Sequence, residues 1–137
     1  MNFSKYQIKQ YDLWDLFLHK SQFPYIGRCY ALARRKDAEK VTDISTEELM
    51  EMFRKVVPEW NRAISMLFKH DWPNVTIFGN ESPHLHADLI PGYNGLREFC
   101  EVKFRNQNQK GNCLPCEKKK LEEEILQEIK HGIMEII

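Results

Sequence analysis

The sequence predicts an α+β domain, with an antiparallel sheet of about five strands, one main helix and a C-terminal helix. Three observations support this prediction. Several short apolar segments end at proline or glycine, as strands joined by turns do. The segment after Ser45 has apolar residues at steps of three and four, which indicates a helix. A charged stretch near the C-terminus carries a second apolar stripe of this kind.

Length and composition fit one domain, residues 1–137, with ordinary globular chemistry. Hydrophobic residues make up 42% of the 137 residues, which is enough for a single core. The 20 basic residues balance the 20 acidic residues, so we expect neither general nucleic-acid binding nor membrane binding. The N-terminus has no apolar signal region, and no run reaches the roughly 18 apolar residues of a membrane span, so we expect a cytoplasmic protein.

Two strands are expected before the main helix. Residues 11–19 alternate loosely between apolar and polar side chains and predict the first strand. Residues 23–27 contain Pro24 and Gly27 and predict a turn. Residues 28–33 are mostly apolar and predict a second strand that is largely buried.

The main helix is expected to begin at a capping box. Ser45 is the predicted N-cap, and Glu48 is the N3 residue whose side chain reaches back to it. Apolar residues then recur at helical spacing until shortly before His70. Pro58 lies inside this pattern. Because proline lacks an N–H group and its ring clashes with the preceding turn, we expect a kink or break there.

Three strands and a helix are expected after the main helix. Residues 74–79 predict a third strand, and residues 84–90 predict a fourth strand that ends at a Pro-Gly turn. A fifth short strand is expected near residues 97–104. From about residue 115 to 137, an apolar stripe on a charged segment predicts a helix that packs on the domain or on a second subunit.

His84, His86 and Asp88, here called the histidine row, alternate with Leu85 and Ala87 in the fourth strand. Alternation points the row to one face of the sheet and the apolar residues to the core. Neighbours in the row are about 6–7 Å apart, since each strand residue adds about 3.3 Å. Such a row suits an anionic or metal-bound ligand. An ordinary amphipathic strand with two incidental histidines is the alternative.

The segment around the histidine row resembles the signature of the histidine triad (HIT) family, in which three histidines alternate with apolar residues. Here the segment reads Pro83-His84-Leu85-His86-Ala87-Asp88-Leu89-Ile90-Pro91. The resemblance continues into the flanking sequence, in the same order as in compact family members: Tyr25-Ile26-Gly27-Arg28, the capped helix, Asn74, Gly79-Asn80 and Gly111-Asn112. It covers about residues 14–112, which would be the core of a HIT-like domain.

The resemblance implies that the protein binds a nucleotide or nucleotide derivative and acts at its α-phosphate, as a hydrolase or nucleotidyltransferase. His86, the middle position, would be the nucleophile, and His84 would orient it and help to bind phosphate. Asn80 and Ser82 would donate hydrogen bonds to phosphate oxygens. The family resemblance also implies a homodimer, and we expect no cofactor.

Asp88 and Lys36 stand where family members usually carry histidines. An ionised carboxylate donates no hydrogen bond and repels phosphate, so Asp88 weakens the site unless it is protonated or paired. We hypothesise that Lys36 pairs with Asp88 across the site or contacts phosphate itself. Two functions therefore stay open: an enzyme that uses His86, and a non-catalytic nucleotide-binding or regulatory protein with a degenerate triad.

Two arrangements of residues could bind a metal, although we expect no metal site. The histidine row is a two-histidine, one-carboxylate set, but its ends are about 13 Å apart along a regular strand, so a bulge would be needed. Cys113 and Cys116 have zinc-knuckle spacing, and Cys29 and Cys100 are the cysteines left to complete a four-cysteine site. Free thiols are the other interpretation. The remaining histidines are expected at the surface or at helix ends: His19, His70 and His131.

Overall fold

A five-stranded antiparallel sheet lies at the centre of the protein, for which a computed structural model describes residues 3–80, 82–105 and 111–137. The strand order is β1-β2-β3-β5-β4. The strands are β1 (Gln7–Gln10), β2 (Trp14–Leu18), β3 (Cys29–Ala33), β4 (Trp72–Thr76) and β5 (His86–Gly92). Because β5 pairs with both β3 and β4, the strand that contains His86 and Asp88 lies inside the sheet and not at its edge.

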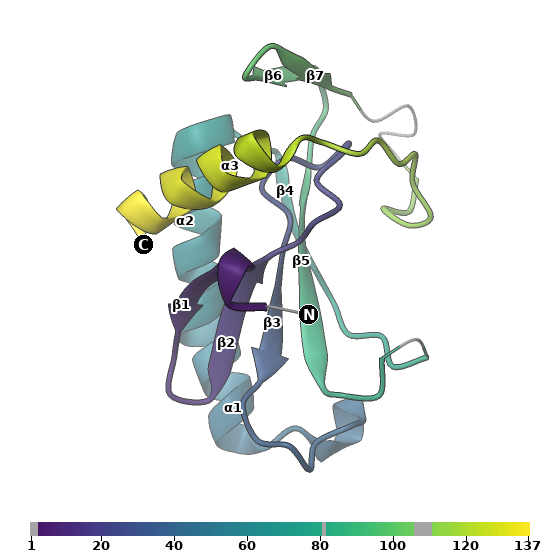
Figure 1. The fold of residues 1–137 in the computed structure, drawn as a ribbon. Coiled ribbons are helices and arrows are strands. Elements are labelled where there is room, and N and C mark those ends of the chain that lie inside the picture. Colours follow the sequence, from purple (N-terminus) through teal and green to yellow (C-terminus); the bar gives the residue numbers. More distant parts are fainter. Residues whose placement is uncertain (1–2, 81, 106–110) are drawn as a thin grey trace.

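Helices cover one face of this sheet. The main helical segment comprises α1 (Thr46–Glu51), a π-helical turn (Met52–Val56) and α2 (Val57–Phe68). The C-terminal helix α3 (Glu123–Ile136) packs against α2 and β1. Figure 1 shows α2 running along the sheet and α3 lying across its upper part. Two short 3-10 helices are also present, at Phe3–Tyr6 and Val41–Asp43. The predicted α+β fold is confirmed.

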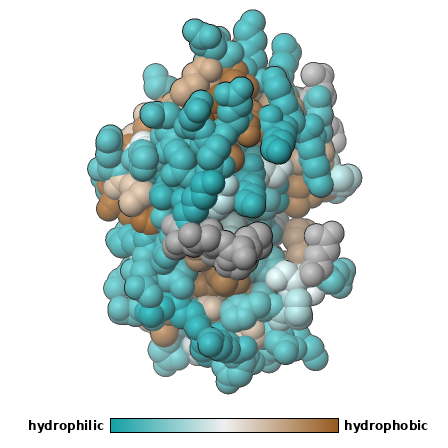
Figure 2. Space-filling view, viewed as in Figure 1, coloured by the Kyte–Doolittle hydropathy of each residue, from teal (hydrophilic) through white to brown (hydrophobic). Residues whose placement is uncertain are grey.

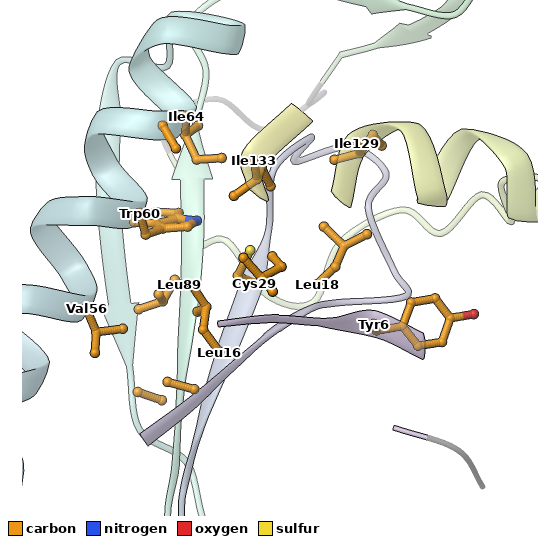
Figure 3. Packing of buried hydrophobic residues seen from close by; sticks show 14 of the residues in the cluster. Tyr6, Leu16, Leu18, Cys29, Val56, Trp60, Ile64, Leu89, Ile129 and Ile133 are labelled. Atoms are coloured by element: carbon orange, nitrogen blue, oxygen red, sulfur yellow. The ribbon is translucent and has the colours of Figure 1, made fainter. Parts of the chain in front are cut away.

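The hydrophobic core lies between the sheet and the helices. Val56, Trp60 and Ile64 of the main helical segment point toward the strands, and Ile129 and Ile133 of α3 extend the same cluster (Figure 3). The sheet contributes every second residue of its central strands, as alternation requires. These residues are Leu16, Leu18, Cys29, Ala31, Ala33, Ala87 and Leu89. The intervening residues of β3 and β5 therefore face the opposite side of the sheet.

Gly27 allows α2 to come close to the turn before β3. Its φ is +96°, a conformation that glycine adopts without steric cost. A Cβ atom at this position would lie 2.8 Å from Cδ1 of Ile64. The Trp60 indole N–H donates a 3.0 Å hydrogen bond to the Gly27 carbonyl. These contacts fix the start of β3 against α2.

The main helix begins at the predicted capping box. The Glu48 N–H donates to Ser45 Oγ at 3.1 Å, and the Ser45 N–H donates to Glu48 Oε1 at 2.8 Å. The irregularity predicted at Pro58 takes the form of the π-helical turn just before α2. Because proline has no N–H to donate and its ring needs space, a wider turn on its N-terminal side accommodates both constraints.

Two buried carboxylates of α1 connect this helix to the sheet. Glu51 accepts hydrogen bonds from the backbone N–H groups of Asp12 and Leu13, at 2.9 and 2.8 Å. Glu48 accepts two hydrogen bonds from the Arg35 guanidinium, each at 3.0 Å. The two carboxylates thus hold α1 against the β1–β2 turn and the end of β3.

The fifth strand of the sheet is β1, and not residues 97–104 as predicted. Gln7–Gln10 contains one apolar residue, so its alternation is too short to indicate a strand. Residues 97–104 instead form a separate hairpin of β6 (Arg97–Phe99) and β7 (Val102–Phe104). Cys100 and Glu101 join them with φ values of 49° and 65°, as a type I′ turn requires. That turn usually contains glycine or asparagine, so the sequence did not indicate it.

The C-terminal helix begins at Glu123 and not near residue 115 as predicted. Glu122 is its N-cap residue, and Glu123 and Glu124 occupy the first turn. Negative charge is favourable at a helix N-terminus, whereas a helix that began near residue 115 would place Lys118–Lys120 close to the positive end of the dipole. The helix therefore begins where the basic run Lys118–Lys120 gives way to glutamates.

The face drawn in Figure 2 is largely hydrophilic, with small apolar groups scattered between charged residues. Across the ranges that the structure covers, every helix is too short or too polar to cross a membrane.

Candidate functional site

The face of the sheet opposite the helices contains a cleft of about 760 Å³. The histidine row lies in this cleft, as the alternation predicted. Residues from β3, from β5 and from the segments beside them line it: His19, Arg28, Tyr30, Leu32, Phe78, Asn80, Ser82, His84, His86, Asp88 and Leu114. The cleft thus combines imidazole, guanidinium, carboxylate and amide groups with an apolar rim.

Antiparallel pairing determines the order of side chains on the cleft floor. His86 of β5 lies opposite Leu32 of β3, and Asp88 lies opposite Tyr30. β5 begins at His86, so His84 precedes the strand instead of lying inside it. His84 still lines the cleft, because its ring Nε2 forms a 2.6 Å hydrogen bond with the Ala33 carbonyl at the end of β3.

A hydrogen bond fixes the protonation of the His86 ring. Nδ1 of His86 lies 2.9 Å from the backbone carbonyl oxygen of His84. Since a carbonyl oxygen can only accept, Nδ1 of the neutral ring carries the proton and Nε2 has a free lone pair. The backbone of His84 therefore orients His86, in addition to any role of the His84 side chain.

Asp88 is buried between two cationic or basic groups. Its Oδ2 lies 3.8 Å from Nε2 of His86, and its Oδ1 lies 3.9 Å from a terminal nitrogen of Arg28. Burial raises the pKa of Asp88, and the neighbouring charges of Arg28 and His86 oppose that rise. The repulsion of phosphate expected from this carboxylate is thus reduced by Arg28.

Lys36 is not one of the described residues that line the cleft. It is exposed after β3, and among the described residues the ion pairs of Asp88 are with Arg28 and His86. The hypothesis of a Lys36–Asp88 pair was therefore wrong. Lys36 was proposed as the partner because it stands where family members usually carry a histidine, whereas the register of β3 and β5 brings Arg28 beside the carboxylate. A contact between Lys36 and phosphate stays a prediction.

Asn80 and Ser82 lie in the segment between β4 and β5 and line the cleft with exposed side chains. Their predicted role as phosphate donors is consistent with this location. Phe78 and Leu32 add apolar surface to the same cleft, and Phe78 is itself exposed. An exposed aromatic ring beside hydrogen-bond donors is a suitable contact for a nucleobase.

Solved structures of similar fold are histidine triad proteins. One from Bradyrhizobium japonicum has a TM-score of 0.74 and 17% identity, over 96% of this chain and 89% of its own. One from Marinobacter aquaeolei has a TM-score of 0.74 and 17% identity, over 95% and 86%. A hypothetical histidine triad nucleotide-binding protein from Sulfolobus tokodaii has a TM-score of 0.71 and 19% identity, over 95% and 81%. The chain has the histidine triad fold. No family model and no curated protein matches its sequence.

Sequence reasoning missed two polar residues of this histidine triad fold, His19 and Arg28. His19 was expected at the surface or a helix end, yet it follows β2 and lines the cleft. Its backbone N–H donates to the Arg28 carbonyl at 3.1 Å, so the two residues are adjacent across β2 and β3. Arg28 lines the cleft together with Tyr30 and Leu32. Because every second residue of a strand faces the same side, this position could have been predicted from the sequence.

The four cysteines are free thiols, and Cys113 and Cys116 lie close enough to interact electrostatically. Cys29 is buried in the core and Cys100 is exposed in the β6–β7 turn, so neither approaches Cys113 or Cys116 as a fourth ligand would. Where the structure describes the chain, no three side chains of histidine, cysteine, aspartate or glutamate are arranged to hold a metal ion.

Proposed function

We propose that this protein is a nucleotide-binding hydrolase or nucleotidyltransferase of the histidine triad family, with His86 as its nucleophile. The observation that carries the proposal is the hydrogen bond from His86 Nδ1 to the His84 carbonyl, which leaves Nε2 unprotonated in the cleft. The Sulfolobus tokodaii protein of the same fold is named a hypothetical histidine triad nucleotide-binding protein, which supports the choice of ligand.

The proposed reaction has two steps at the α-phosphorus. The Nε2 lone pair of His86 forms a bond to phosphorus while the bond to the leaving group breaks and its electron pair departs with that group. Water then attacks phosphorus, the nitrogen–phosphorus bond breaks, and its electron pair returns to Nε2. The ring gains positive charge in the first step. The Asp88 carboxylate, 3.8 Å from Nε2, is placed to stabilise that charge.

Asn80, Ser82 and His84 complete the proposed site. The amide and hydroxyl would donate hydrogen bonds to the non-bridging phosphate oxygens, which become more negative during the reaction. The His84 ring donates to the Ala33 carbonyl through Nε2, so Nδ1 of the neutral ring has no proton. His84 therefore contributes to the proposed site through its backbone carbonyl, which orients His86. We also propose a homodimer in the cytoplasm, as the sequence analysis predicted.

Turnover of adenosine monophosphate (AMP) phosphoramidates and dinucleoside polyphosphates by wild type and by His86→Ala tests the proposal. We expect the variant to lose activity by about a thousandfold or more. His131→Ala, which changes an exposed histidine of α3, is the matched control and should retain full activity. If wild type and His86→Ala both bind nucleotide and are equally inactive, the proposed enzymatic activity is refuted.

That last outcome would support the second candidate, a non-catalytic nucleotide-binding or regulatory protein with a degenerate triad. The observation in its favour is the buried carboxylate of Asp88 at the third position, which cannot donate a hydrogen bond when ionised. Equilibrium binding of AMP by wild type and by Ser82→Ala separates this candidate from a protein that binds no nucleotide.

A further inference from the structure

Arg28 is a buried guanidinium that lines the cleft and has no side-chain hydrogen bond to the described part of the chain. The residue is 7% exposed, and its Nε is buried with no partner. None of its side-chain nitrogens donates a hydrogen bond to any of the described residues. Its backbone is held firmly, since the Arg28 carbonyl accepts from Gln22 Nε2 at 2.7 Å and the Arg28 N–H donates to the Tyr25 carbonyl at 3.0 Å. The side chain is thus placed in the cleft by a fixed turn.

Asp88, the charged partner of Arg28, accepts no hydrogen bond from the Arg28 guanidinium. Asp88 Oδ1 lies 3.9 Å from the nearest Arg28 nitrogen, which is beyond hydrogen-bond distance. Arg35 in the same protein shows what a satisfied guanidinium looks like, with two bonds of 3.0 Å to Glu48. A guanidinium has five N–H donors and favours oxyanions that accept two of them together. Arg28 therefore has donors available for an anionic group in the cleft.

His19 adds a neutral donor at the same end of the cleft. The Ser21 N–H donates to Nδ1 of His19 at 3.0 Å, so the proton of the neutral ring is on Nε2. Burial, followed by the positive charges of Arg28, His86 and Lys118, lowers the pKa of His19 to about 4. At neutral pH the ring thus offers one N–H and no further acceptor. Arg28 and His19 together form a donor-rich end of the cleft.

Asp88 lies between this donor-rich end and the proposed nucleophile. One of its oxygens faces Nε2 of His86 at 3.8 Å, and the other faces Arg28 at 3.9 Å. The Asp88 carboxylate therefore separates a ligand phosphorus at His86 from the Arg28 guanidinium. Arg28 and His86 line the same cleft and flank the same carboxylate, which favours Arg28 as the partner of the next phosphate in a polyphosphate chain bound at His86.

We propose that Arg28 is the specificity-determining residue of the site, and that it binds a second phosphate next to the phosphorus at His86. This assignment rests on the proposed nucleotide function. It selects nucleoside polyphosphate derivatives over phosphoramidates, whose leaving groups carry no second phosphate. In the free protein, Asp88 holds the guanidinium in place and is neutralised by it. When the ligand binds, the second phosphate becomes the main partner of Arg28.

The test is calorimetric binding of AMP and of α,β-methylene adenosine diphosphate, which has a second phosphate and resists hydrolysis. We expect wild type to bind the diphosphate analogue at least about tenfold more tightly than AMP. Arg28→Gln should lose this preference. Because that variant leaves the buried Asp88 carboxylate without its guanidinium partner, Arg28→Gln with Asp88→Asn is measured beside it and should also show no preference. Arg54→Gln, the same change at an exposed arginine of the main helix, should retain the preference.

Turnover gives a second measure of the same preference. Arg28→Lys should lower kcat/KM for a dinucleoside polyphosphate by about tenfold or more, because lysine cannot bind an oxyanion through two fixed donors. The kcat/KM for an AMP phosphoramidate should fall by a smaller factor, so the ratio of the two kcat/KM values should decrease. A tenfold preference that survives in the double variant would overturn the role of Arg28. AMP binding by wild type without a preference for the diphosphate would do the same and leave the nucleotide site intact, whereas wild type that binds neither ligand would refute both proposals.

Discussion

Acid sensitivity of the fold should depend on His19, because this histidine must stay neutral in the folded protein. Burial and the nearby charges of Arg28, His86 and Lys118 lower its pKa to about 4, against about 6.5 for an unfolded histidine. Between these values the unfolded chain binds a proton that the folded chain excludes. Stability is therefore unaffected above pH 6.5 and falls as the pH drops toward 4.

The expected loss follows from these two pKa values. For one group, lowering the pH from about 7 to about 5 should reduce the free energy of unfolding by about 2 kcal/mol. His19→Asn removes this contribution. Asparagine places its amide oxygen near the former position of Nδ1, so the Ser21 N–H can still donate to it. The variant should therefore lose about 2 kcal/mol less than wild type over the same pH interval.

Urea unfolding at the two pH values, followed by tryptophan fluorescence, measures this difference. His70, whose pKa burial also lowers, is present in both proteins, so its contribution cancels in the comparison. His131→Asn is the control, because an exposed imidazole is hydrated before and after unfolding. The reasoning fails if His19→Asn and wild type lose the same free energy between the two pH values.

Two further predictions concern the framework that positions the site. Glu51→Ala should lower the free energy of unfolding by about 2 kcal/mol, because the N–H groups of Asp12 and Leu13 lose a buried acceptor. Gly27→Ala should lower it by about 2–4 kcal/mol, because its φ is +96° and the new Cβ would lie 2.8 Å from Cδ1 of Ile64. Adding Ile64→Val, which removes that methyl group, should recover part of the loss. Denaturant titration measures all three.

Matched controls separate these effects from the general cost of substitution. Glu47→Ala, at an exposed position of α1, should change stability by no more than about 0.5 kcal/mol. Gly79→Ala should be equally mild, since a Cβ there has no atom within 4 Å. If Glu51→Ala resembles Glu47→Ala, the two backbone hydrogen bonds contribute nothing measurable. If Gly79→Ala is as damaging as Gly27→Ala, steric contact with Ile64 is not the cause.

The parts of the fold that local patterns encode could be predicted from the sequence. The capping box at Ser45 and Glu48 is a short-range signal, and the structure has both of its hydrogen bonds. The histidine row was predictable because strand alternation determines which side chains share a face. β1 was missed because it is an edge strand with a single apolar residue. Its strand conformation is stabilised by pairing with β2, which its own sequence does not indicate.

The partners within the site depend on pairing between strands, which no local pattern specifies. Arg28 and Asp88 are 60 positions apart, and they meet because the register places Tyr30 opposite Asp88. His19 joins them because β2 and β3 pair with their ends aligned. Lys36, chosen by family position alone, lies beyond the paired residues of β3. The identity of the charge beside Asp88 thus required the sheet to be known.

The π-helical turn before Pro58 also sets the angular phase between the two halves of the main helix. Each residue of a regular helix turns the chain by about 100°. A wider π-helical turn rotates the chain by less per residue, so converting Met52–Val56 to a regular α-helix of the same length would rotate α1 relative to α2. The carboxylates that bind Arg35 and the β1–β2 turn would then point elsewhere. A helical irregularity on one side of the sheet thus fixes the connections at the end of β3, the strand that forms the floor of the cleft on the other.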